Sequence, residues 1–141
     1  VEVLAEMAIL LNFKVLIQTQ EDDKDRYKLV DQIITDPLDL EDIDHKIDYF
    51  ILATHHRDDH KQSLSALEAG INYVAVIASQ KKAVLIKDHL KENNVSDELL
   101  ARFHSPAGLD INAKTAEEIG LSIMSEIVMH RNSGSGEPMG N

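Results

Sequence analysis

Short apolar runs alternate with helical segments, and this alternation constrains the fold more than any other feature of the sequence. The runs are rich in β-branched and aromatic side chains, which is typical of strands covered by helices. Strands that alternate with helices favour a parallel sheet, so the chain is predicted to have an α/β fold with a mostly parallel sheet. The expected strands are 13–17, 32–35, 49–53 and 73–77, and the expected helices are 1–11, 59–69, 80–92, 96–103 and 115–130, with a weak helix or turn over 38–46.

Charge and composition exclude several classes of function. The 141 residues include 25 acidic and 14 basic side chains, so the formal net charge is −11, which disfavours overall binding to nucleic acid or an anionic membrane. The absence of cysteine excludes disulfides, thiolate nucleophiles and cysteine-ligated metals, and fits a reducing compartment such as the cytoplasm. No apolar run approaches the ~20 residues that span a bilayer. We therefore expect no membrane or nucleic-acid partner.

The beginning of the chain departs from the usual doubly wound pattern. Such a sheet normally opens with a strand and a glycine-rich turn ahead of its first helix, whereas this sequence opens in the helical segment 1–11 and contains no G-x-G-x-x-G. The pattern leads us to expect a further strand before this helix, placed centrally in the sheet beside 13–17. At the other end, residues 132–141 contain three glycines, two serines and a proline, and are predicted to form a flexible tail.

Residues 79–82 form the first candidate site, at the point where a buried strand turns into a helix. Ser79 can cap the helix, and the backbone N–H groups of the first turn favour an anion. Lys81 and Lys82 oppose the helix dipole there, which suggests a phosphate or an acidic partner. On this hypothesis, replacing both lysines by alanine leaves or raises the stability of the protein without ligand. The alternative is a plain N-cap with solvated lysines, and the residues alone do not decide between the two.

The loop after the strand 49–53 is the second candidate. Parallel sheets bind ligands beyond the carboxyl ends of their strands. Thr54 and His55 lie at that position and are predicted to hydrogen-bond a ligand. The neighbouring histidines match no metal-ligand spacing, so no metal is expected. The alternative interpretation is a polar loop in which Asp58 or Asp59 caps the next helix.

The third candidate is the turn Ser105-Pro106-Ala107-Gly108-Leu109-Asp110. Pro106 restricts its own φ angle and Gly108 permits a positive one, so backbone amides of this turn could approach a ligand. For this segment alone, a purely structural turn is the favoured interpretation. We predict nevertheless that Thr54, Ser79 and Gly108 converge on one crevice. No motif or carboxylate pair identifies a catalytic residue.

Together these segments resemble the Rossmann domain of the XdhC/CoxI family, accessory factors of molybdenum hydroxylases. Ala53-Thr54-His55 is followed by Asp59 and Leu67, and Tyr73 to Lys82 is similar to the family's Tyr-Ile-Gly-x-x-Gly-Ser-Arg-x-Lys stretch. The segment from His104 to Glu126 resembles the family's His-x-Pro-x-Gly-Leu-x-Ile-x-Ala-x-Thr-Pro-x-Glu-Ile pattern. Ala75, Ala78, Gln80 and Ala116 depart from residues usual in the family.

The resemblance implies a Rossmann-like three-layer fold over residues 1–131 and a protein that binds a molybdopterin-type cofactor. Such a factor assists sulfuration of the cofactor and its insertion into a xanthine dehydrogenase- or CO dehydrogenase-type hydroxylase. The implied partners are the hydroxylase apoenzyme, a sulfur-donating enzyme and a second copy of the chain. The implied cofactor-binding residues are Thr54, His55, Ser79, Gln80, Lys81, Lys82, Pro106, Gly108 and Leu109.

Two other functions remain open on the sequence. One is a small NAD(P)-binding oxidoreductase domain, which the absent glycine-rich turn disfavours. The other is a scaffold protein whose acidic first half docks a partner and which binds no small molecule. The resemblance favours an accessory factor over a catalyst.

Overall fold

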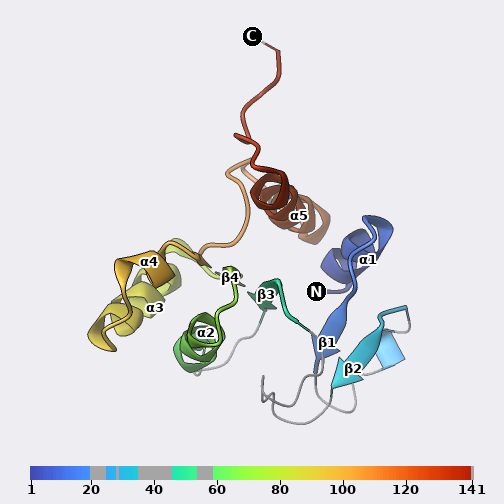
Figure 1. Cartoon of the computed structure of the whole chain (residues 1–141). Helices are drawn as coiled ribbons and strands as arrows, with labels where there is room; N and C mark the ends of the chain where they lie inside the picture. The colour runs from blue at the N-terminus through green and yellow to red at the C-terminus, as the bar shows by residue number, and fades with distance from the viewer. Residues whose placement is uncertain (20–24, 28, 35–45, 54–58, 141) are drawn as a thin grey trace. The chain divides into compact units, whose positions relative to one another are not determined.

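The computed structural model describes residues 1–19, 25–27, 29–34, 46–53 and 59–140. They form an α/β structure in which every described strand pairs in parallel, as the alternation predicts (Figure 1). The chain divides into two compact units: the central unit, Leu40–Ala107, and the terminal unit, which combines Val1–Asp39 with Gly108–Asn141. None of the helices in the described part of the chain is long and apolar enough to cross a membrane.

The central unit contains a three-stranded sheet in the order β3-β4-β5. Its elements are β3 (Tyr49–Leu52), α2 (Asp59–Glu68), β4 (Tyr73–Val76), α3 (Gln80–Glu92), α4 (Asp97–Leu100) and β5 (Phe103–His104). All four residues of β4 are buried. The middle position of β4 in the sheet explains this burial, because a strand on each side and helices above it leave little backbone or side chain exposed.

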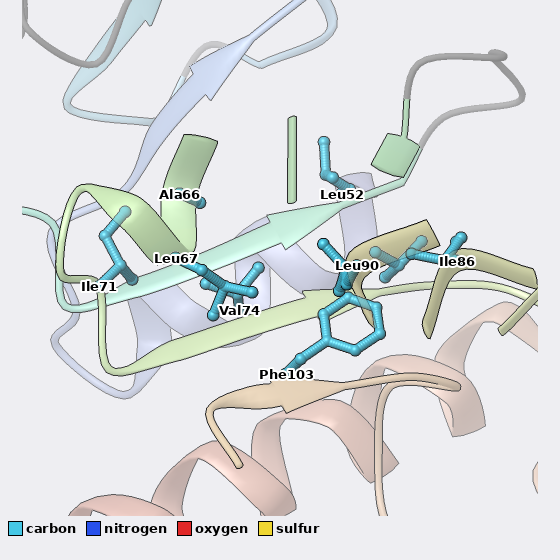
Figure 2. Close-up of a cluster of buried hydrophobic side chains, with 9 residues drawn as sticks. Leu52, Ala66, Leu67, Ile71, Val74, Ile86, Leu90 and Phe103 are labelled. Atoms are coloured by element: carbon cyan, nitrogen blue, oxygen red, sulfur yellow. The ribbon is translucent and has the colours of Figure 1, made fainter. Parts of the chain in front are cut away.

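The core of the central unit lies where the sheet meets α2 and α3 (Figure 2). Side chains on one face of β4 and β5 contact the buried residues of both helices there. Every second residue of a strand points to the same face of the sheet. The cluster consists of Leu52, Ala66, Leu67, Ile71, Val74, Val76, Ile86, Leu90 and Phe103. Tyr73 points to the opposite face of β4 from Val74 and Val76. Its ring lies edge-on to the ring of Tyr49 and stacks on the ring of His104, with 5.8 and 4.5 Å between the respective ring centroids.

The terminal unit consists of α1 (Glu2–Leu10), β1 (Leu16–Gln18), β2 (Gln32–Ile34) and α5 (Ala116–Asn132). β1 pairs with β2, and α1 packs against α5. Gly120 of α5 lies at this contact, where an added Cβ atom would be at an ordinary van der Waals distance, 3.5 Å, from both Val3 Cγ1 and Met7 Sδ of α1. The guanidinium of Arg131 lies 4.7 Å from the centre of the Phe13 ring.

Most predicted elements are confirmed, and three differences have a physical cause. β1 begins at Leu16 rather than at 13, because Val15 donates its N–H to the Asp31 carboxylate at 2.7 Å. The predicted helix 96–103 ends at Leu100, and Phe103 and His104 form β5. Val74 donates its N–H to Arg102 O at 2.9 Å, so pairing with β4 overrides the local helical tendency.

The third difference concerns β3, whose continuous apolar sequence favours a strand covered on both faces. Its first three residues are only half-buried. β3 lies at one edge of the described three-stranded sheet, so it has one paired neighbour where β4 has two. The predicted element at 38–46 falls almost wholly outside the described residues, and the expected strand ahead of 1–11 stays a prediction.

Candidate functional site

The start of α3 has the geometry that the sequence predicts. Ser79 is in an extended conformation (φ −68°, ψ 162°), and its Oγ accepts the N–H of Lys82 at 3.2 Å. Ser79 and Gln80 lie three and four residues after the end of β4 and are exposed, as is Lys81. Helix geometry gives the first-turn N–H groups of Gln80 and Lys81 no carbonyl partner within α3. The Ser79 hydroxyl can still donate its own hydrogen, so this turn offers several donors to an anion.

Lys82 differs from the solvated lysine of the plain N-cap interpretation. Its Nζ lies 2.5 Å from Oδ2 of Asp59, the first residue of α2, whose side chain is only 3% exposed. A carboxylate taken out of water requires a compensating charge, and Lys82 supplies it. Because of this ion pair we now expect that removing Lys82 lowers the stability of the protein, whereas the effect of removing Lys81 stays a prediction. A role of Lys82 in ligand binding stays a prediction.

Asp59 is itself held at the start of α2, where a negative charge favours the helix dipole. Its backbone carbonyl accepts the hydroxyl of buried Ser63 at 2.7 Å. Sequence reasoning considered Asp59 as a helix cap and as one residue of the family pattern, and not as a partner of Lys82. The signal that could have revealed its role is an acidic residue in the first turn of one helix and a lysine in the first turn of the next, each helix following one of two neighbouring parallel strands.

The turn that contains Pro106 is anchored on the carboxyl end of β4. Ser105 Oγ donates to Val76 O at 3.1 Å, and Ala107 N–H donates to the same carbonyl at 3.0 Å. Ser79 lies only three residues beyond Val76. The central unit thus brings Pro106 and the Ser79 turn to the same end of the sheet, where ligands of parallel sheets bind.

Gly108 and Leu109 are occupied by structural contacts in the terminal unit. Gly108 has a φ of 103°, and a Cβ atom there would lie 2.4 Å from Ser122 Oγ of α5, which explains the glycine. Its N–H donates to Glu126 Oε1 at 3.3 Å, and Leu109 N–H donates to Ser122 O at 3.1 Å. These contacts agree with the structural interpretation of the turn. Since Gly108 belongs to the other unit, its predicted convergence with Ser79 stays a prediction.

The start of α5 provides a contrasting helix terminus. Thr115 Oγ1 accepts the Glu118 N–H at 3.1 Å, and Glu118 Oε1 accepts the N–H groups of Lys114 and Thr115 at 2.8 and 3.0 Å. This is the predicted capping box. The two backbone hydrogen bonds hold the pKa of the Glu118 carboxyl below its usual value.

Thr54 and His55 lie outside the described residues. Beside them in sequence, His60 of α2 stacks on His89 of α3 with 4.5 Å between ring centroids. No group of three or more metal-ligating side chains occurs in the part of the chain that the structure describes. The candidate site of the central unit is therefore the turn formed by Ser79, Gln80 and Lys81 beside Pro106, whose hydrogen-bond donors and lysine suit an anion.

Comparisons with known proteins agree with this architecture. A curated protein of Escherichia coli (strain K12), "Uncharacterized protein YqeB", is 32% identical over 97 residues, which is 69% of this chain and 18% of that protein. A solved structure titled as a xanthine dehydrogenase (BH1974) from Bacillus halodurans superposes with a TM-score of 0.76 at 22% identity. It matches 94% of this chain and 41% of that one, so this chain spans less than half the length of either protein.

At 22% identity the solved structure establishes the fold, which is Rossmann-like. The family is established by sequence. The profile of the XdhC Rossmann domain matches residues 1–127, which include every described helix and strand of the central unit and most of α5. This chain therefore belongs to the XdhC Rossmann domain family.

Proposed function

We propose that this domain acts in an accessory factor that binds the molybdenum cofactor and assists its sulfuration and insertion into a xanthine dehydrogenase- or CO dehydrogenase-type hydroxylase. Membership of the XdhC family supports an accessory role beside such an enzyme. The observation that carries the binding proposal is the exposed Ser79 turn at the carboxyl end of the fully buried strand β4. The turn is exposed beside a buried strand, which suits reversible binding of a cofactor.

The chemistry of the turn fits the phosphate that a molybdopterin-type cofactor carries. The Ser79 hydroxyl and the first-turn N–H groups are hydrogen-bond donors, and the helix dipole favours negative charge at the same point. Lys81 adds a full positive charge that can form a charge-assisted hydrogen bond. Lys82 contributes less net charge, because Asp59 neutralises it.

The Ser105–Ala107 segment would form one side of the same site. Its two hydrogen bonds to Val76 O fix it beside the β4 end, so Pro106 offers an apolar surface against which a planar pterin can rest. The bound group would supply the molybdenum chemistry of the hydroxylase, while residues of this chain hold and orient it. We assign no catalytic residue.

Fluorescence titration of the full-length protein with purified molybdopterin tests this proposal. We expect saturable binding, and we expect the double variant Ser79→Ala/Lys81→Ala to bind roughly tenfold or more weakly because it loses a donor and a charge. Binding should weaken with added salt, since the contact is exposed. Lys87→Ala is the matched control, because it removes a lysine from the same helix two turns away from the site.

The outcome separates the candidate functions. Saturable pterin binding that depends on Ser79 and Lys81 supports the proposal. Binding of NAD or NADP in the same titration, without pterin binding, would favour the oxidoreductase alternative. If the double variant binds molybdopterin as tightly as the parent, the Ser79 turn is not the binding site.

A further inference from the structure

The ion pair between Lys82 and Asp59 lies at the same edge of the sheet as the Ser79 turn. Asp59 begins α2, which follows β3, and Lys82 lies in the first turn of α3, which follows β4. β3 and β4 are parallel neighbours, so both helices begin beyond the carboxyl ends of these strands. Ser79 Oγ accepts the N–H of Lys82, and Nζ of the same lysine contacts Asp59 Oδ2 at 2.5 Å. Lys82 thus links the cap of α3 to a buried carboxylate.

The two lysines of this turn have different surroundings. Lys81 is exposed and has no ion pair among the residues that the structure describes. The side chain of Lys82 is 36% exposed and that of Asp59 only 3%, so solvent reaches the ammonium but hardly reaches the carboxylate. Lys81, Lys82 and Asp59 together have a formal charge of 2 − 1 = +1. An anion that enters from solvent therefore meets one uncompensated lysine and one that is neutralised from inside the protein.

We propose that Asp59 is a specificity-determining residue, which acts through Lys82 to match the Ser79 turn to a single phosphate group and against polyphosphates such as nucleoside triphosphates. This inference rests on the proposed function, since it concerns the anion that the same turn binds. Coulomb energy is proportional to the product of the charges, so the loss of one positive charge weakens binding most for the most highly charged anion. A phosphate monoester has a charge of about −1.5 to −2 at pH 7, and a triphosphate carries more.

The position of Lys82 makes its charge count at the Ser79 turn. Lys82 lies three residues after Ser79, which corresponds to a rise of about 4.5 Å along the helix. This separation is within the Debye length of ~8 Å at physiological ionic strength, so dissolved salt screens the charge only partly. The hydroxyl, the first-turn N–H groups and Lys81 still serve one phosphate. Specificity is a difference of affinities, and the neutralised lysine lowers the affinity for polyphosphates most.

Burial suits Asp59 to this role. Its charge lies at the start of α2, where the helix dipole favours it, and its backbone carbonyl accepts the hydroxyl of buried Ser63 at 2.7 Å. Salt screens a buried pair much less than an exposed one. Asp59 therefore neutralises Lys82 over a wide range of salt concentrations, without itself facing the ligand.

Titration calorimetry of the full-length protein with inorganic phosphate and with inorganic tripolyphosphate, both without magnesium, tests the inference. Asp59→Asn releases the charge of Lys82 with almost no change in side-chain volume. This variant should bind phosphate about threefold and tripolyphosphate about tenfold more tightly than the parent. The salt dependence of tripolyphosphate binding should also increase, because a further positive charge faces the anion. A purely structural role of Asp59 predicts the opposite, since a loosened turn would bind both anions more weakly.

Two further variants show whether the effect runs through Lys82. Asp88→Asn is the matched control, because it removes one negative charge from an exposed position of α3 more than two turns from Ser79. It should leave the ratio of the two affinities unchanged. Asp59→Asn/Lys82→Met removes both members of the ion pair and should keep the parent's ratio, since the formal charge of the turn stays at +1. This double variant leaves no unpaired buried charge, so it keeps the test valid if Asp59→Asn folds poorly.

Failure of this inference is distinct from failure of the proposed function. If Asp59→Asn keeps the parent's ratio of affinities, Asp59 does not set specificity, whereas molybdopterin binding that depends on Ser79 and Lys81 still supports the proposed function. If the double variant prefers phosphate more strongly than the parent does, Lys82 acts in the parent as an uncompensated charge, which also overturns the inference. If the parent binds neither inorganic anion nor molybdopterin, the inference and the proposed binding site both fail.

Discussion

The two longest helices begin in opposite ways. Both carry a hydroxyl side chain at the N-cap, Ser79 for α3 and Thr115 for α5, and both hydroxyls accept the N–H three residues later. The first turn of α5 contains Glu117 and Glu118, and Glu118 also binds backbone donors ahead of the helix. The first turn of α3 contains no acidic residue and two lysines. The start of α5 therefore has carboxylates of its own, whereas the first turn of α3 has none.

This difference shows how local sequence can separate a structural helix start from a binding one. The carboxylates of α5 satisfy the positive end of its dipole, so nothing further is needed there. The lysines of α3 oppose the dipole, and only Lys82 has a described partner in Asp59. Lys81 adds a positive charge to the first turn of α3. An external anion would therefore stabilise the start of α3 more than the start of α5.

The largest expected effect comes from separating Lys82 from Asp59. Lys82→Met should destabilise the protein by about 3 kcal/mol, because it leaves a buried carboxylate without its ammonium partner. Urea unfolding monitored by circular dichroism measures this change. A loss below about 0.5 kcal/mol would mean that the pair is no more than a solvated surface contact.

A double-mutant cycle sharpens this prediction. The double variant Asp59→Asn/Lys82→Met should be more stable than Lys82→Met alone, since it removes the buried charge together with its partner. Additive effects of the two substitutions would contradict coupling between these side chains.

The two caps should differ in strength. Thr115→Ala should cost about 1 kcal/mol, because it removes one half of a reciprocal capping box. Ser79→Ala should cost less, because the Ser79 hydroxyl caps α3 alone, without a returning carboxylate. Thermal unfolding of both variants without ligand makes the comparison, and a larger loss for Ser79→Ala would contradict it.

A charge change at Lys81 should make α3 resemble α5. Lys81→Glu should stabilise the protein without ligand by about 0.5 kcal/mol, because it replaces an unfavourable charge in the first turn by a favourable one. The same substitution should abolish binding of molybdopterin at low salt. Lys87→Glu, farther along α3, is the control, and a variant that gains stability while binding normally would disprove an anion site at Lys81.

The smallest expected effect is the pH dependence of the α5 start. The pKa of Glu118 is lowered in the folded protein by hydrogen bonds from Lys114 and Thr115. The ionised Glu118 carboxylate therefore contributes to the free energy of unfolding at pH values above its pKa in the unfolded chain, near 4.5. This contribution is lost as the pH falls through its pKa in the folded protein. Urea unfolding of the parent and Glu118→Gln at pH 7, 5 and 3 should show that their difference shrinks toward low pH. An unchanged difference would assign the pH dependence to other carboxylates.

The sequence alone predicted the features that depend on neighbours within one turn. The bounds of α3, the Ser79 cap, the Thr115–Glu118 capping box and the positive φ of Gly108 follow from contacts over three or four residues or from the residue's own conformational range. The family was also recognisable, because His104 to Glu126 keeps a long and specific pattern. These signals depend only on the order of neighbouring residues in the chain, so they can be recognised without knowing any distant contact.

Only the tertiary structure decided which side chains those local features meet. Lys82 and Asp59 are 23 positions apart, and their pairing depends on how α2 and α3 flank β4. β5 exists because its residues pair with β4, and Gly108 is fixed by Ser122 and Glu126 of α5. These contacts join segments that packing of the core brings together, and short-range propensity carries no information about them.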